Sequence, residues 1–188
     1  MKKPTLLALL VMLVILLTWG CNDSKNEDET TAATTAALRF DDNLARENEE
    51  IVFSFLLDDQ QNKRSTLCID KSGEYLVFRF GASPSNVIEV TGMRQDTHKA
   101  FSYDYYFRGG GKENLGLDLN YLYFADASYQ YDLFDEFDAV DESRSIGITI
   151  HSLADESSKT YYAADSTIIG SLGAIRDDRF SELITWEE

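Results

Sequence analysis

Apolar and aromatic residues recur at every second position over much of the chain after residue 50, and this pattern limits the possible folds most strongly. In 101–107, for example, Phe101 and Tyr103 alternate with Ser102 and Asp104, and similar alternation is present in 117–124, 129–133 and 146–150. Successive side chains of a β-strand point to opposite faces, so a period of two rich in β-branched and aromatic residues predicts strands.

Shorter apolar runs extend this pattern to most of the body of the chain. Gly73 marks a predicted tight turn, and the polar segment 58–63 marks a hairpin loop. Regularly spaced strands without a long helix predict an all-β fold, namely a single antiparallel β-barrel or β-sandwich of about 8–10 strands. The further candidate strands are 51–57, 65–70, 74–80, 87–91 and 160–169.

The segment ahead of the strands has a different composition. Residues 22–37 contain no aromatic and no large aliphatic side chain, so they cannot bury enough apolar surface to offset the entropy lost on ordering. We expect a disordered tether here. Residues 41–50 then suggest one short helix, with Asp41 or Asp42 as its cap.

The first twenty residues have the features of a secretory signal. Lys2 and Lys3 precede an uncharged, mostly apolar run from Thr5 to Trp19. That run is shorter than the roughly 20 residues that a membrane-spanning helix needs. A short apolar segment behind two lysines, ending at a small residue, is typical of a signal peptide.

The end of this segment, Leu17-Thr18-Trp19-Gly20-Cys21, resembles the lipobox of bacterial lipoproteins. Gly20 and Cys21 match that motif, whereas Thr18 and Trp19 differ from it. The resemblance implies a signal peptide at 1–20, a lipidated Cys21 with a flexible acidic tether at 21–48, and a β-rich domain at 49–188. It also implies a lipoprotein anchored in the bacterial cell envelope, at the outer membrane, and facing either the periplasm or the cell surface.

Four acidic residues follow Cys21 closely, and two interpretations of them stay open. They resemble the acidic export signal that sends some lipoproteins of the Bacteroidetes type to the outer face. Alternatively, they only keep the tether solvated. These residues are Asp23, Glu27, Asp28 and Glu29.

Charge and cysteine content narrow the classes of partner. The chain of 188 residues has a formal net charge of -16 and a pI near 4.4, which disfavours nucleic acid because phosphate binding needs clustered Lys and Arg. The same charge favours a cationic protein as partner, for instance a basic host hydrolase. Cys21 and Cys68 are too few for a disulfide framework, and Cys68 lies in a predicted strand where burial is expected.

Catalytic and metal-binding patterns are weak. Pro84 interrupts the nearest approach to a nucleophile elbow, at 81–85. His98 and His151 have no metal-ligand spacing, so a hydrolase site would need them to converge with carboxylates. The acidic run 132–142 either collects oxygen ligands for Ca²⁺ or is a strand leaving the sheet into a solvated loop. We expect no cofactor.

Three glycines lie between two cations in the segment Arg108–Lys112. Successive glycine amides can bind a small anion, but the segment lacks the Ser or Thr and the helix of a phosphate-binding loop. A hairpin or bulge that needs positive φ is the simpler interpretation.

Tyrosines are concentrated in three successive predicted strands. They occur at both parities, so either both faces of this region are covered or one face is a binding surface, since exposed tyrosines suit protein or sugar recognition. The tentative binding surface consists of Tyr103, Tyr105, Tyr106, Tyr121, Tyr123, Arg108 and Lys112.

These features together suggest a non-enzymatic binding protein of the cell envelope, anchored to the membrane through acylated Cys21. One alternative is an envelope hydrolase that uses carboxylates with or without a metal. Another is an accessory subunit of an envelope complex, with its tyrosine-rich strands as the interface.

Overall fold

A computed structural model describes residues 42–187 apart from 59–61 and 112–114. The described residues belong to one compact unit, Ala37–Glu188. The predicted signal peptide, Cys21, the tether up to residue 41 and Lys112 lie outside the described residues.

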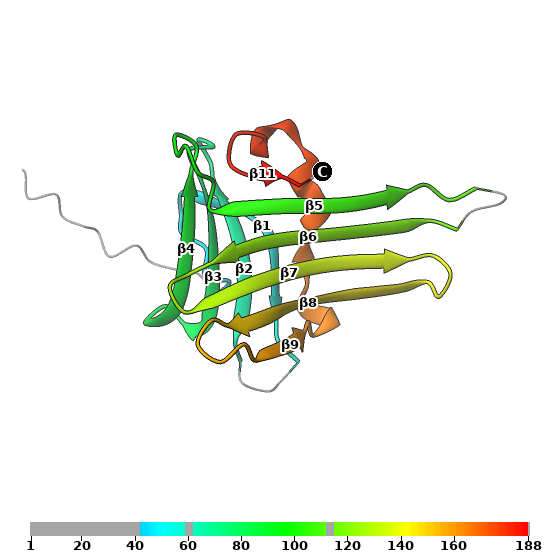
Figure 1. Cartoon of the computed structure of the whole chain (residues 1–188), viewed down its shortest axis with the longest axis horizontal. Coiled ribbons are helices and arrows are strands. Elements are labelled where there is room, and N and C mark those ends of the chain that lie inside the picture. The colour runs from blue at the N-terminus through cyan, green and yellow to red at the C-terminus, as the bar shows by residue number, and fades with distance from the viewer. Residues whose placement is uncertain (1–41, 59–61, 112–114, 188) are drawn as a thin grey trace, which may run out of the picture. The chain divides into compact units, whose positions relative to one another are not determined.

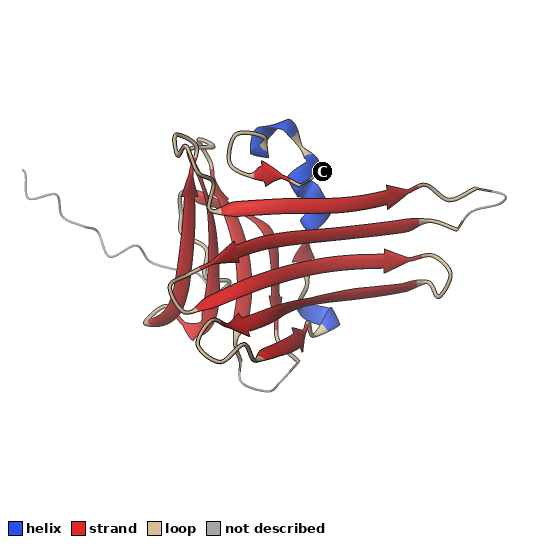
Figure 2. Cartoon of the chain, viewed as in Figure 1, coloured by secondary structure: helices blue, strands red, loops and turns tan. Residues whose placement is uncertain are grey.

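The described chain forms two β-sheets, which confirms the all-β prediction and selects a sandwich over a barrel. One sheet has the order β10-β1-β2-β3-β4 and the other β11-β5-β6-β7-β8-β9, and every pairing is antiparallel except β11 with β5. The strands of the two sheets run crosswise (Figures 1 and 2), as in orthogonally packed sandwiches. The strands are β1 (Glu49–Leu56), β2 (Arg64–Asp70), β3 (Tyr75–Ser83), β4 (Asn86–Met93), β5 (Phe101–Arg108), β6 (Leu117–Ala125), β7 (Tyr129–Asp138), β8 (Ser143–Ser152), β9 (Ser158–Tyr162), β10 (Ile169–Gly170) and β11 (Thr185–Trp186).

The core lies between the sheets and follows the alternation along each strand. In β7, Tyr131 and Leu133 are fully buried, whereas the intervening Asp132 points outward. Phe78 of β3 packs against Phe124 of β6 across the interface, with ring centroids 4.3 Å apart. Cys68 is buried as expected, on the other side of its sheet, with Ala45 and Val77.

The short helix expected over 41–50 is wrong for the described part of that segment, because residues 42–48 form turns and Glu49 begins β1. Leu44 has a left-handed φ of 62°, and its carbonyl accepts a hydrogen bond from Nη1 of Arg79. Contacts with the sheet therefore replace helical hydrogen bonds, and the segment covers the outer side of β1–β3.

The strand predicted over 160–169 ends at Tyr162, and this part of the prediction is also wrong. Ala163 pairs with Leu57 and the Ala164 amide donates to the Leu56 carbonyl, so the chain crosses from the second sheet to the first. Three short 3₁₀ helices accompany the C-terminal chain, which buries Leu172, Ile175, Phe180 and Leu183 in the core. They are η2 (Asp165–Thr167), η3 (Leu172–Arg176) and η4 (Asp178–Phe180).

The hairpins β5–β6 and β7–β8 project beyond the first sheet, as Figure 1 shows. Their far ends therefore carry large apolar side chains that no core covers. Tyr105, Tyr106, Phe107, Phe137 and Val140 are all at least 40% exposed.

Candidate functional site

The outward face of the second sheet carries a row of aromatic side chains. The register pairs Tyr121 of β6 with Phe134 of β7, and Gly147 of β8 with Tyr162 of β9, so these positions form one line across the sheet. Tyr123 lies on the same face two residues further along β6. Tyr106 also lies on this face, near the C-terminal end of β5. We call this surface, formed by the outward positions of β5–β9, the outward face.

Two pairs of rings organise the outward face. The rings of Tyr121 and Tyr123 stack with centroids 6.3 Å apart and planes 12° apart, and Tyr162 meets Phe134 edge to face at 6.0 Å. Gly147 makes the second pair possible, since a Cβ there would lie 2.5 Å from Cζ of Phe134 and 2.4 Å from the Tyr161 carbonyl oxygen. Both pairs border a shallow hollow of about 340 Å³.

Carboxylates are interleaved with these rings. The Tyr121 hydroxyl donates to Oε1 of Glu136 at 2.6 Å, and Nε2 of His151 lies 2.9 Å from Oδ2 of Asp132. Asp104, which faces Tyr121 across the β5–β6 ladder, has no side-chain hydrogen bond to any described residue. These acids have no cationic neighbours on the outward positions of β6–β9, where the described residues include no Lys or Arg.

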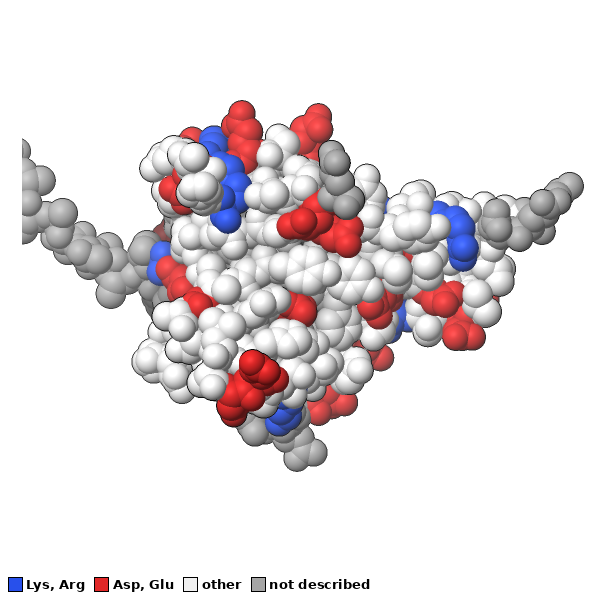
Figure 3. All heavy atoms as spheres, in the orientation of Figure 1, with Lys and Arg blue, Asp and Glu red and all other residues white. Residues whose placement is uncertain are grey.

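This environment raises the pKa of both Tyr121 and Tyr123. Partial burial, reinforced by the hydrogen bond to Glu136, raises the pKa of Tyr121 well above its ordinary value. Partial burial and the nearby charges of Asp104 and Asp132 raise the pKa of Tyr123. Both hydroxyls therefore remain protonated donors near neutral pH. Figure 3, which looks onto this face, shows Asp and Glu among uncharged side chains, with Lys and Arg toward the margins.

The structure splits the predicted binding surface between two faces. Tyr106, Tyr121 and Tyr123 point outward, but Tyr103 is fully buried, and its hydroxyl donates to Oδ1 of Asn120 at 2.6 Å. Tyr105 lies on the inner side, beyond the core, with the Arg176 guanidinium 5.2 Å from its ring centroid. The division follows from strand geometry, since residues of opposite parity cannot share a face.

Arg108, the described one of the two cations in the predicted surface, forms a hydrogen bond within its own hairpin connection. Arg108 is exposed and its Nε donates to the Leu115 carbonyl at 3.0 Å, which braces the β5–β6 connection. Gly109, Gly110 and Gly111 do not adopt positive φ, so the expectation that they need it is wrong, whereas Gly73 does adopt it in its predicted turn. Lys112 and Cys21 lie outside the described residues.

Phe134 and Tyr162 belong to the outward face but were not among the predicted site residues. Phe134 lies in the acidic run, and Tyr162 lies near the start of the strand predicted over 160–169. The signal that identifies them is the cross-strand register, which a single chain sequence reveals only once each hairpin turn is placed.

The histidines and the acidic run do not assemble a metal centre in the described part of the chain, where no group of three His, Cys, Asp or Glu side chains is arranged around a common point. His98 lies in the exposed loop after β4, and His151 lies on β8. The acids of β7 have separate partners, because Asp132 faces His151, Glu136 faces Tyr121, and Asp135 binds Arg144.

Comparison of the chain with protein-family models, with curated proteins and with solved structures finds no match. The described part of the chain contains no helix with the length and apolar composition that a bilayer-spanning segment requires.

Proposed function

We propose that this protein is a non-enzymatic binding module of the bacterial cell envelope, anchored to the membrane by lipid on Cys21, that binds a cationic protein through its outward face. The observation that carries the proposal is the composition of this face. Its exposed and half-buried tyrosines lie among carboxylates, and Arg108, at the end of β5, is the one Lys or Arg at its described outward positions.

Tyrosine and carboxylate are complementary to lysine and arginine in two ways. A guanidinium or ammonium group gains from lying over an aromatic ring, and it forms stronger hydrogen bonds with carboxylates than with neutral acceptors. Asp104 lies beside Tyr121 and Tyr123 without a side-chain partner among the described residues, so it is available to such a group.

The charge of the whole chain supports the same partner class. A net charge of -16 attracts a basic protein at long range and raises the rate of encounter, and this effect weakens with salt. The lipid anchor and the acidic tether would hold the β-sandwich at the membrane, where it meets proteins of the periplasm or the cell surface.

Binding to lysozyme, used as a basic hydrolase probe, tests this function. The full chain in phospholipid nanodiscs should bind lysozyme at about 50 mM salt and several-fold more weakly at about 300 mM, where screening is stronger. Asp104→Asn should weaken binding by about two- to fivefold. Glu47→Gln removes the same charge on the far side of the sandwich and serves as the control. Equal affinities of the two variants, or no binding at low salt, would contradict the proposal.

A second candidate function is an accessory subunit of an envelope complex. It is favoured by the exposed apolar side chains on the projecting hairpins, namely Tyr106, Phe107, Leu115, Phe137 and Val140. If this candidate holds, Phe107→Ser should shift the protein extracted from envelopes to a smaller sedimenting species, and Leu153→Ser, at a different exposed turn, should not. An unchanged sedimentation profile for Phe107→Ser would exclude an interface at these hairpins.

A further inference from the structure

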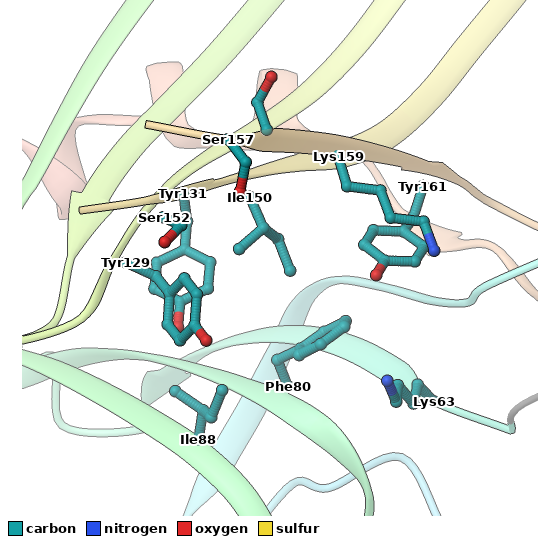
Figure 4. A pocket seen from close by; sticks show the side chains of 11 residues that line it. Lys63, Phe80, Ile88, Tyr129, Tyr131, Ile150, Ser152, Ser157, Lys159 and Tyr161 are labelled. Carbon is teal, nitrogen blue, oxygen red and sulfur yellow. The ribbon is translucent and has the colours of Figure 1, made fainter. Parts of the chain in front are cut away.

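A second hollow lies between the two sheets at one edge of the sandwich, away from the outward face. It has a volume of about 480 Å³ and lies where β3 and β4 face β7–β9. Phe80 and Ile88 line it from the first sheet, and Tyr131, Ile150 and Tyr161 from the second (Figure 4). Small-molecule pockets typically have volumes of about 300–1,000 Å³ and mostly apolar linings, and this hollow fits both criteria.

The hollow is continuous with the main core. Ile88, Ile150 and Tyr161 pack against that core on one side and line the hollow on the other. The hydroxyl of Tyr131 donates to Oδ2 of Asp126 at 2.7 Å, so this tyrosine already has a partner for its polar end. An occupant would therefore bury an apolar body against rings and aliphatic side chains.

Two lysines give the hollow a charge opposite to that of the chain. Lys63 and Lys159 both line it, whereas no Asp or Glu of the described residues lines it. Nζ of Lys159 lies 4.6 Å from the ring centroid of Tyr161, and Nζ of Lys63 lies 6.0 Å from that of Phe80. Neither ammonium forms an ion pair with a carboxylate of the described residues.

The lysines are also segregated within the hollow. Figure 4 shows Lys63 and Lys159 on one side of it, and Ile88, Tyr129 and Tyr131 on the other. The site therefore has a cationic end and an uncharged end, where Ser152 lies beside the rings and Ile88, and this division suits a molecule with one anionic group and an uncharged, mainly apolar body.

We infer that this hollow binds an amphipathic carboxylate, of which a fatty acid is the simplest example. The carboxylate lies at Lys63 and Lys159, and the hydrocarbon extends toward Ile88 and Tyr131. This site is separate from the outward face, so it can be occupied whether or not a cationic protein is bound there.

Photochemical labelling tests this inference in the full chain held in phospholipid nanodiscs. Dodecanoic acid carrying a diazirine in its chain is added, illuminated, and located by mass spectrometry of the digested protein. We expect labelled peptides from the Phe80–Ile88 and Tyr129–Tyr161 regions, protected by excess dodecanoate and not by excess dodecanol, since only the acid offers a charge to the lysines.

Lysine variants give the discriminating comparison. Lys63→Gln and Lys159→Gln should each reduce labelling at these peptides by about tenfold, as expected for loss of one charge-assisted contact. Lys71→Gln is the control, because Lys71 lies outside the hollow and donates to the Glu47 carbonyl. Labelling that is insensitive to both hollow lysines would overturn the inference. Equal protection by dodecanol and dodecanoate would also overturn it, since the site would then be merely apolar.

Discussion

Arg79 and Glu49 form the most buried ion pair of the described structure, and it shows how much one residue contributes to the stability of the fold. Both side chains are fully buried, and Nη1 and Nη2 of Arg79 lie 2.6 and 2.8 Å from the two carboxylate oxygens of Glu49. Arg79 also donates through Nε to Glu89 at 2.7 Å. Loss of the Glu49 charge removes the carboxylate that accepts both Nη hydrogen bonds of a fully buried guanidinium, which is costly.

We therefore expect Glu49→Gln to lower the free energy of unfolding by about 3–5 kcal/mol, measured by urea denaturation at neutral pH. Glu50→Gln is the matched control, because Glu50 is exposed and its ion pair with Arg179 lies at the surface. A loss below about 1 kcal/mol for Glu49→Gln, comparable to that of a surface pair, would refute the importance of the buried pair.

The same pair predicts a dependence of stability on pH. Burial alone would raise the pKa of Glu49, but the hydrogen bonds from Arg79, the Arg46 amide and Tyr75, together with the charge of Arg79, outweigh it and hold the pKa below its ordinary value. A carboxyl group with a lowered folded-state pKa adds stability above its unfolded pKa, and that stability is lost as the pH falls through the folded value. The wild type should therefore lose stability below about pH 4.5, and Glu49→Gln should lose less over the same range. Parallel pH profiles would contradict this.

Gly147 provides a residue-scale test of the outward face. Gly147→Ala should destabilise the fold by about 1–3 kcal/mol, because the new methyl group collides with Phe134 and with the Tyr161 backbone. Gly109→Ala is the control, since its Cβ would meet nothing within 4 Å, and its effect should stay within about 0.5 kcal/mol. Thermal unfolding of the two variants measures the difference, and equal midpoints would show that the ring packing over β8 is loose.

At the scale of elements, Asp135 of β7 links the second sheet to the C-terminal segment 171–184 through hydrogen bonds. Its Oδ2 accepts hydrogen bonds from Oγ of Ser171 at 2.9 Å and from the Leu172 amide at 3.0 Å, and both of its oxygens bind Arg144 at 2.8 Å. Asp118 binds Arg176 of the same segment, but the Asp118 side chain is 31% exposed, whereas that of Asp135 is 4% exposed.

We expect Asp135→Asn to destabilise the protein by about 3 kcal/mol and to speed amide hydrogen exchange in η3 first, because the contacts of the buried Asp135 carboxylate with Arg144 and with the Leu172 amide weaken together. Asp118→Asn should cost less, about 1 kcal/mol, because the carboxylate that it replaces is reached by solvent. Exchange in η3 that is unchanged by Asp135→Asn would show that apolar packing alone holds the segment.

The elements also show where sequence reasoning succeeds and where it stops. Strands such as β5 and β6 were predictable because the alternation that defines them is local. The segments 42–48 and 171–184 were not, since their conformation depends on distant partners such as Arg79 and Asp135. The outward face was half predictable: parity separates Tyr106 from Tyr103, but only the register between strands brings Tyr162 to Phe134.

At the scale of the whole molecule, lipid attachment is a prediction about residues ahead of the described sandwich. Cells fed radiolabelled palmitate should incorporate label into the wild-type protein and not into Cys21→Ser, because the proposed acylation needs that thiol. A Cys68→Ser variant should remain labelled, since Cys68 is buried in the fold. Label retained by Cys21→Ser, or absent from the wild type, would remove the basis for membrane anchoring.

The central claim is that a cationic protein binds the outward face, and carboxyl footprinting of the complex with lysozyme tests it most directly. Carbodiimide modification followed by mass spectrometry should show Asp104 protected in the complex, together with the partly exposed Asp132 and Glu136, while Glu47 on the far side keeps its reactivity. Unchanged reactivity of Asp104, Asp132 and Glu136 in a complex that has formed would contradict the claim.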